Sequence, residues 1–299
     1  MKVICTTALA ALLVTGLHAA GPCGGHGTRE SMLVSTAWLA QHLHDPDLVI
    51  LSVGDKSQYD EGHIPGALYL DYMDTHYMQS PTGLTLEILP MEDLARNFGR
   101  LGVTNDSRIV LYWSRNQYSP TTRVFWTLDA MGLASQTSIL DGGFPLWKNE
   151  GRPVSTEVRS VTAGKLAPCA QDDVVTDIAW VRANLNHPGV HIVDARDPEY
   201  YTGARTGNGK RPGHIPGATN ITFSTLLGDQ GKFKSPDILA GMFRAGGVKA
   251  GDRVVSYCHI GQQATVVYFV ARYLGYDARL YDGSWEDWSA HSDYPAEKP

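Results

Sequence analysis

One cysteine is the residue of this sequence that is best placed to do chemistry. Cys258 follows the largely apolar residues 253–257, and the loop that begins with it leads into a helix-like segment closed by Gly275. At such a strand-to-helix turn, several backbone N–H groups and a helix N-terminus converge, and they favour the thiolate over the thiol. A buried structural cysteine is the commoner role of a free thiol. The loop context favours a reactive nucleophile.

The overall composition allows two domains and argues against several classes of function. The 299 residues are enough for two domains of ordinary size. With a net charge of -6 the chain has no broad basic surface, so we expect no binding to nucleic acid or to an anionic membrane. No phosphate-binding glycine-rich motif, metal-ligand cluster or flavin motif stands at a credible position. We therefore predict no dissociable cofactor and no metal site.

The N-terminal segment predicts export. Lys2 is followed by an apolar stretch over residues 3–17 and by the small residues Ala19 and Ala20, which is the pattern of a secretory signal peptide. We predict that residues 1–20 are this signal peptide and that the mature protein is periplasmic or secreted. A membrane anchor is the alternative, but the stretch is short for a spanning helix and no later stretch is long enough.

Three cysteines remain after removal of such a leader. They are Cys23, Cys169 and Cys258, and an odd number in an oxidising compartment leaves at least one thiol unpaired. Cys23 lies in a glycine-rich tail and Cys169 in a segment between domains, so these two could pair without involving the core. Cys258 would then be the free thiol.

The sequence contains the same order of elements twice. Residues 62–67 and 213–218 both read Gly-His-Ile-Pro-Gly-Ala, at corresponding places in the two halves. Residues 141–147 and 282–288 both begin with Asp-Gly and end with Trp. Such a repeat indicates two domains of one fold.

Each half alternates short apolar strands with amphipathic helices. This alternation predicts an α/β fold in which each domain has a mainly parallel sheet flanked by helices. We assign residues 28–157 to the first domain, residues 158–172 to a linker and residues 173–299 to the second domain. Ligands of such sheets bind beyond the carboxyl ends of the strands, which is where Cys258 falls.

The two copies differ at the position of the nucleophile. Trp113 stands in the first copy where Cys258 stands in the second. An indole cannot act as a nucleophile of this kind. We therefore expect the first domain to be catalytically silent and to close the active cleft.

With these motifs the chain resembles the tandem-domain rhodaneses, the thiosulfate and 3-mercaptopyruvate sulfurtransferases. The resemblance rests on the paired Gly-His-Ile-Pro-Gly-Ala segments, Asp-Ala-Arg at 194–196, the loop at Cys258 and Asp-Gly-Ser-Trp at 282–285. It covers nearly all of the chain after the leader. It implies two tandem rhodanese-like domains of which only the C-terminal one carries the nucleophile.

The resemblance also implies a chemistry. Cys258 would take the outer sulfur of a small-molecule donor as a persulfide and pass it to cyanide or a thiol acceptor, with a thioredoxin-like reductant as a further partner. The loop amides would stabilise the negative charge, and Gly261 would let the backbone curl. The implied substrate-binding residues are Arg196, His259, Ile260, Gly261, Gln262, Gln263 and Ala264.

The choice of donor is less clear from the residues. His259 and Ile260 are neither the basic residues typical of thiosulfate-specific members nor the small neutral ones of 3-mercaptopyruvate-specific members. We favour thiosulfate, because Arg196 and a protonated His259 could balance its two charges; 3-mercaptopyruvate is the alternative. For Arg196 the alternative role is a surface or interdomain salt bridge.

Two other classes of function are weighed against sulfur transfer. A related phosphatase loop needs an arginine where this chain has Ala264, so phosphatase activity is not expected. A sulfur-carrying or sensing module in which Cys258 never turns over is the non-enzymatic alternative. Both copies have a histidine at the same position of the repeated segment, His63 in the first and His214 in the second. Since only one copy has the nucleophile, this indicates that the histidines lock a turn rather than act in catalysis.

Overall fold

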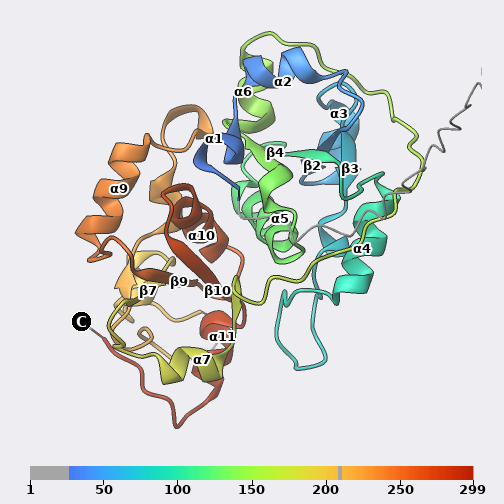
Figure 1. Ribbon diagram of the computed structural model, residues 1–299. Helices are drawn as coiled ribbons and strands as arrows, with labels where there is room; N and C mark the ends of the chain where they lie inside the picture. The colour runs from blue at the N-terminus through green and yellow to red at the C-terminus, as the bar shows by residue number, and fades with distance from the viewer. Residues whose placement is uncertain (1–26, 208–210, 299) are drawn as a thin grey trace, which may run out of the picture.

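The computed structural model describes residues 27–207 and 211–298. Within them lie two α/β domains that are joined by an extended segment (Figure 1). Each domain contains one five-stranded sheet in which every pair of neighbouring strands is parallel. The prediction of a tandem α/β fold with mainly parallel sheets and flanking helices is confirmed.

The first domain has the strand order β1-β5-β4-β2-β3. Its strands are β1 (Leu33–Val34), β2 (Leu48–Val53), β3 (Leu68–Leu70), β4 (Arg108–Trp113) and β5 (Thr137–Leu140). Its helices are α1 (Arg29–Met32), α2 (Thr36–His42), α3 (Lys56–Glu61), η1 (Tyr72–Asp74), α4 (Met91–Arg100), α5 (Tyr118–Ala130), η2 (Ala134–Gln136) and α6 (Gly143–Asn149).

The second domain repeats this order as β6-β10-β9-β7-β8. Its strands are β6 (Val175–Thr176), β7 (Val190–Asp194), β8 (Thr219–Asn220), β9 (Arg253–Tyr257) and β10 (Asp277–Tyr281). Its helices are α7 (Ile178–Ala183), α8 (Pro198–Tyr201), η3 (Phe223–Leu226), η4 (Asp229–Gly231), α9 (Pro236–Ala245), α10 (Ala264–Tyr273) and α11 (Ser284–Ala290).

The duplication extends to individual hydrogen bonds. Ser35 caps α2 by accepting from the Trp38 backbone N–H, and Asp177 caps α7 by accepting from Trp180 in the same way. The indole of Trp147 donates to the Pro153 carbonyl over 2.7 Å, and the indole of Trp288 donates to the Pro295 carbonyl over 2.8 Å. The two domains therefore have the same hydrogen bonds at the start of their first long helix and after their last helix.

The repeated Gly-His-Ile-Pro-Gly-Ala segments hold their turns through the histidines. The ring of His63 stacks on Tyr59 with its Nδ1 2.8 Å from the Tyr59 carbonyl, and His214 stacks on Tyr201 with its Nδ1 2.9 Å from the Tyr201 carbonyl. Both rings are buried. This geometry agrees with a role in locking the turn.

The largest part of the hydrophobic core is shared between the domains. One continuous cluster joins α4 and α5 of the first domain to α9 and α10 of the second, while two smaller clusters cover the outer faces of the two sheets. At the seam Phe125 of α5 meets Phe269 of α10 edge to face, with 4.9 Å between the ring centroids. The helices α5 and α10 thus bury each other's apolar faces, and this packing holds the two sheets together.

The segment between α6 and β6 contains neither helix nor strand in the described part of the chain. It lies against the first domain, where the N–H groups of Gly164, Cys169 and Gln171 donate to carbonyls of that domain. Cys169 is disulfide-bonded. The predicted partner Cys23 lies outside the described residues, so the pairing of these two stays a prediction, as does the signal peptide at 1–20.

Candidate active site

Cys258 lies at the carboxyl end of β9, on the side of the sheet that faces the first domain. Residues along β9 alternate between the shared core, which holds Val254 and Cys258, and the outer cluster, which holds Val255 and Tyr257. The Cys258 side chain is fully buried, and it is the free cysteine of the described residues. The thiol therefore sits at the seam between the domains, close to the point where α10 begins.

The loop from Cys258 to residue 263, called here the Cys258 loop, leaves a row of backbone N–H groups without acceptors. Among the described residues, no N–H of 259–264 donates a hydrogen bond, whereas those of Thr265 and Val266 donate to the Gln262 and Gln263 carbonyls. Gly261 adopts φ +83°, a backbone conformation that glycine accepts and that residues with a side chain rarely adopt. Unpaired amides beside a helix N-terminus form a site suited to an anion.

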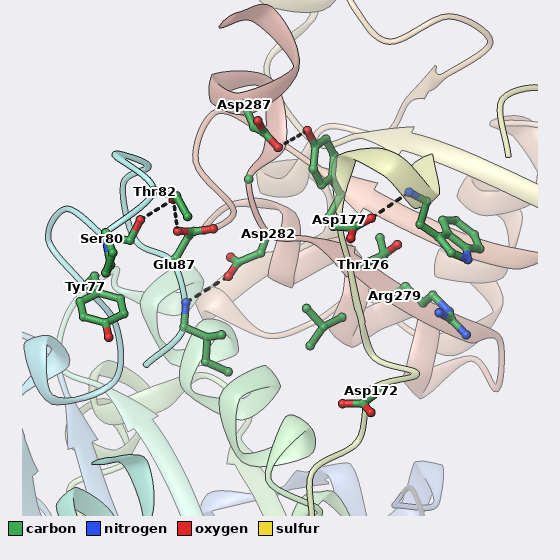
Figure 2. A pocket seen from close by; sticks show the side chains of 16 residues that line it. Tyr77, Ser80, Thr82, Glu87, Asp172, Thr176, Asp177, Arg279, Asp282 and Asp287 are labelled. Atoms are coloured by element: carbon green, nitrogen blue, oxygen red, sulfur yellow. Dashed lines mark hydrogen bonds between the residues drawn. The ribbon is translucent and has the colours of Figure 1, made fainter. Parts of the chain in front are cut away.

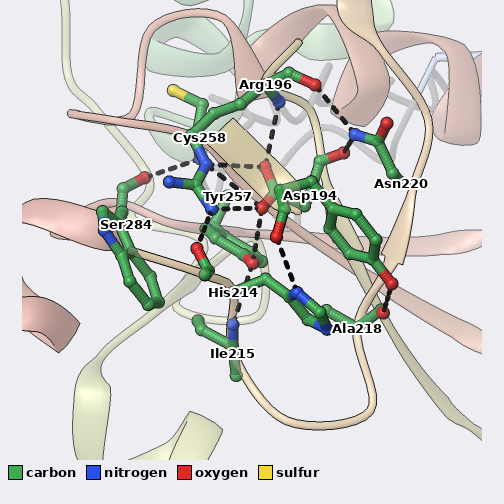
Figure 3. Close-up of polar contacts among 12 residues, drawn as sticks. Asp194, Arg196, His214, Ile215, Ala218, Asn220, Tyr257, Cys258 and Ser284 are labelled. Atoms are coloured by element: carbon green, nitrogen blue, oxygen red, sulfur yellow. Dashed lines mark hydrogen bonds and ion pairs between the residues drawn. The ribbon is translucent and has the colours of Figure 1, made fainter. Parts of the chain in front are cut away.

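Ser284 fixes the start of this loop, a role that its place in the Asp-Gly-Ser-Trp motif did not indicate. Its hydroxyl accepts from the Cys258 N–H over 3.1 Å (Figure 3). It also donates to the Tyr281 carbonyl over 2.9 Å. Its backbone has φ +52°, which is uncommon for a serine. The available signal was the difference between the copies, because the first domain has Gly143 at this position.

The corresponding place in the first domain is filled by an indole. Trp113 is buried, and a Cβ on Gly143 would lie 2.5 Å from its Nε1. Tryptophan and glycine thus occupy together the space that Cys258 and Ser284 share in the second domain. A cysteine in place of Trp113 would leave much of the volume of the buried indole empty.

Arg196 is held inside the second domain. Its Nε and Nη2 donate to both carboxylate oxygens of Asp194 over 2.5 to 3.1 Å, and Nη2 also donates to the Gly213 carbonyl over 2.8 Å (Figure 3). The guanidinium lies over the Trp285 ring, with 4.7 Å between its Cζ and the ring centroid. Burial disfavours its charge, but the hydrogen bonds and charge of Asp194 outweigh this and raise the pKa of Arg196. The ion pair is neither at the surface nor between the domains, and binding of the donor by Arg196 stays a prediction.

His259 is held neutral, and this corrects the expectation of a protonated ring. Burial, followed by the positive charge of Arg196, lowers the pKa of His259 to about 4. The ring meets Tyr200 edge to face with 4.5 Å between the centroids. At neutral pH, His259 therefore supplies no charge to a donor.

His259 and Ile260 line a cavity at the mouth of the site. Its volume is about 350 Å³, and the other lining residues are Thr85, Tyr200, Gly207, Trp285 and Glu286. Thr85 belongs to the first domain and donates to the Glu286 carboxylate. The cavity therefore opens along the seam and is walled by both domains.

The remaining predicted site residues face the first domain or the core. Gln262 donates to the Ser119 hydroxyl over 3.2 Å and accepts from the Tyr72 hydroxyl over 3.4 Å. Gln263 has a buried side-chain carbonyl with no partner among the described residues. Ala264 is fully buried at the start of α10.

Tyr72 is a first-domain residue at the site that the sequence did not indicate. Burial raises the pKa of Tyr72; the positive charge of Arg123 opposes this rise and the negative charge of Asp282 adds to it. The phenol therefore keeps its proton and donates to Gln262. Nothing local in the sequence marks this tyrosine, since it reaches the loop only through the packing of the two domains.

A larger cavity lies elsewhere along the seam. It measures about 600 Å³ between the first-domain segment at 77–88 and the region of β6, α7 and β10 (Figure 2). Its walls carry several carboxylates, and most of these already accept hydrogen bonds, as Asp282 does from Ile88 and Asp287 from Tyr281. Cys258 lines neither cavity, but His259 and Ile260 of the Cys258 loop line the smaller one, so we place the chemistry there.

The described residues contain neither a metal-binding cluster nor a helix that could span a membrane. No group of three or more His, Cys, Asp or Glu side chains among them could hold a metal ion. No helix in the same part of the chain is long and apolar enough to cross a membrane.

Two tandem parallel-sheet domains, with one loop cysteine at the end of the second sheet, define a class of two-domain α/β proteins. Comparison with known proteins assigns the family: the rhodanese-like domain matches residues 35–150 and again residues 177–291. The chain therefore belongs to the rhodanese family of sulfurtransferases, as its resemblance predicted.

Individual relatives cover most of the chain. The sulfur carrier protein TtuD of Thermus thermophilus is 33% identical over 275 residues, which are 86% of this chain and 93% of the relative. The thiosulfate sulfurtransferase of Azotobacter vinelandii is 30% identical over 268 residues, 89% of this chain and 97% of the relative. The solved structure of EanB superposes with a TM-score of 0.79 at 20% identity, covering 90% of this chain and 70% of EanB, and supports the fold alone.

Proposed function

We propose that this protein is a sulfurtransferase that moves a sulfane sulfur from thiosulfate to cyanide or a thiol through a persulfide on Cys258. The observation that carries the proposal is the Cys258 loop, in which a lone thiol stands beside six backbone N–H groups with no acceptor among the described residues. Unpaired amides in the same loop as the thiol can stabilise a thiolate and a persulfide anion alike. The named thiosulfate sulfurtransferase among the relatives supports the same reaction class.

The proposed reaction has two displacements at sulfur. The Cys258 thiolate attacks the outer sulfur of thiosulfate; a new S–S bond forms, the old S–S bond breaks, and sulfite leaves with the electron pair. Cyanide then attacks the outer sulfur of the persulfide, forms thiocyanate and returns the pair to Cys258 as thiolate. A thiol acceptor gives a persulfide of its own, and a thioredoxin-like dithiol can release that sulfur as hydrogen sulfide while forming its own disulfide.

Access to the thiol requires movement at the seam. The Cys258 side chain is fully buried, while the neighbouring cavity is lined by His259 and Ile260. A donor that enters this cavity reaches the thiol only if side chains at the seam give way. Since His259 is neutral and the Arg196 cation is already paired with Asp194, we assign the stabilisation of thiosulfate's charge mainly to the unpaired amides of the Cys258 loop.

The donor is tested by intact-mass measurement followed by steady-state kinetics. The protein is treated with thiosulfate or with 3-mercaptopyruvate, and we expect one added sulfur on the wild type and none on Cys258→Ser. With cyanide as acceptor, we expect a larger kcat/KM for thiosulfate. A larger value for 3-mercaptopyruvate would transfer the proposal to that donor, and a persulfide on Cys258→Ser would remove Cys258 from it.

A sulfur carrier is the second candidate, because the relative from Thermus thermophilus bears that name. A carrier takes up sulfur on Cys258 and passes it only to a particular partner. Repeated turnover with cyanide or a small thiol favours the enzyme. A persulfide that forms once and is not discharged by either acceptor favours the carrier.

We also propose that the protein is exported. The apolar N-terminal stretch has the pattern of a signal peptide, and the disulfide at Cys169 fits an oxidising compartment. Expression of the full chain with a C-terminal tag, followed by cell fractionation and N-terminal mass analysis, tests this. We expect a processed form outside the cytoplasm; an unprocessed cytoplasmic form would contradict export.

A further inference from the structure

The first domain contributes a buried cation to the seam beside the active site. Arg123 of α5 is fully buried, and its Nη1 donates to the Asp282 carboxylate over 2.5 Å. Its Nη2 donates to the Leu86 carbonyl. Burying a guanidinium costs free energy unless its donors are paired, and Nε has no partner among the described residues. A residue with this cost that bridges two domains calls for a role beyond filling space.

Arg123 touches the Cys258 loop directly. Its Nη1 also donates to the Gly261 carbonyl over 3.3 Å. In a planar trans peptide the carbonyl and the following N–H point in opposite directions. Holding the Gly261 carbonyl towards Arg123 therefore turns the Gln262 N–H away from it. One guanidinium from the first domain thus sets the orientation of a peptide in the row of unpaired amides.

Arg123 acts on the same loop by a second route through Asp282. The other oxygen of that carboxylate accepts from the Ile88 N–H over 3.1 Å, so the turn after β10 is held from both sides. Two residues further on, the Ser284 hydroxyl accepts from the Cys258 N–H over 3.1 Å. The position of Asp282 therefore bears on the peptide that carries the nucleophile.

We propose that Arg123 is a positioning residue for the Cys258 loop, so that the domain without a cysteine completes the active site. The inference rests on the proposed function, and it gives the first domain more than the cleft-closing role expected from the sequence. Nη1 makes both contacts in the second domain, at Gly261 and Asp282, while Nη2 at the other end of the planar fork is held by the Leu86 carbonyl of the first domain. Removing the fork should loosen the loop and make the Cys258 thiolate less favourable.

The test compares wild type, Arg123→Met and Arg123→Lys. Methionine keeps much of the apolar stem without the donors, and lysine keeps the charge without the fork. Tyr268→Phe is the matched control, because it removes another interdomain hydrogen bond, from the Tyr268 hydroxyl to Asp129 over 2.6 Å, away from the loop. Urea unfolding checks that each variant is folded.

Ionisation of Cys258 is read from ultraviolet thiolate absorbance against pH, with Cys258→Ser as the blank, and kcat is measured with thiosulfate and cyanide. We expect an ionisation constant and a kcat at least about tenfold lower in Arg123→Met, since loss of oriented donors commonly has effects of this size. Arg123→Lys should recover only a small part, and Tyr268→Phe should match the wild type.

Three results would overturn the inference. The first is wild-type ionisation and kcat in Arg123→Met. The second is full recovery in Arg123→Lys, which would show that the charge suffices, and the third is an equal loss in Tyr268→Phe, which would show that any interdomain hydrogen bond has this effect. If Arg123→Met does not fold, Arg123→Lys decides, because it must still fall below the wild type. Thiolate ionisation needs no sulfur transfer. A protein that fails to turn over thiosulfate would therefore refute the proposed function while leaving this measurement valid.

Discussion

Replacing Gly261 by alanine should cost activity far more than a comparable replacement elsewhere in the same domain. Gly261 has φ +83°, and an added Cβ would lie 2.7 Å from the Asp282 carbonyl oxygen and 2.8 Å from its carboxylate. The carbonyl belongs to the backbone and cannot rotate aside. Restoring an ordinary van der Waals distance requires a shift of roughly half an ångström or more in the Cys258 loop or in the turn at Asp282.

The control separates backbone strain from this clash. Gly251 has φ +85°, and a Cβ there would meet nothing within 4 Å. Alanine in the left-handed region costs roughly 1–2 kcal/mol at either position. Only at Gly261 does the displacement reach the amides beside Cys258. A misplacement of this order in a reacting group lowers rates by about tenfold to a hundredfold, or roughly 1.4 to 2.7 kcal/mol in the barrier.

The assay combines urea unfolding with kcat/KM for thiosulfate and cyanide. We expect Gly251→Ala to lose roughly 1–2 kcal/mol of unfolding free energy with unchanged kcat/KM. Gly261→Ala should lose at least as much stability and, in addition, about tenfold or more in kcat/KM. If the kcat/KM of Gly261→Ala equalled that of Gly251→Ala, the loop geometry would not matter for the reaction and the reasoning would be refuted.

Three further predictions concern stability. Burial, followed by the charge of Arg123, lowers the pKa of His76 to about 4; between about pH 6.5 and 4 the unfolded chain binds a proton that the folded protein does not. The unfolding free energy should therefore fall on acidification, by up to about 3 kcal/mol from this residue, and urea titrations should show a shallower fall in His76→Phe. Valine at Thr122 and Thr265, whose hydroxyls lie 2.8 Å apart across the seam, should give a coupling of about 1 kcal/mol in a double-mutant cycle; additive effects would contradict a direct bond. Arg196→Gln leaves the buried Asp194 carboxylate without its cation and should cost roughly 3–5 kcal/mol in urea unfolding, and a loss below about 1 kcal/mol would contradict the ion pair.

The sequence by itself was enough for the fold and for the place of the thiol. The residues of each repeated motif are neighbours in the chain, and the strand that precedes Cys258 is recognisable from its apolar run. Because parallel strands bring their carboxyl ends to one edge of a sheet, the position of Cys258 in its segment already placed it at a binding edge. The absence of a cysteine at Trp113 likewise needed only the comparison of the two copies.

The tertiary structure alone decided how the site is held and charged. Arg123 and Tyr72 reach the Cys258 loop from the other domain, and His259 loses its charge through burial near Arg196. The Ser284 hydroxyl accepts from the Cys258 N–H across the loop. Hydrogen bonds between distant segments and the loss of solvent around a side chain depend on how α5 packs against α10. Neither leaves a regular pattern along the chain, so no reading of local spacing could have supplied them.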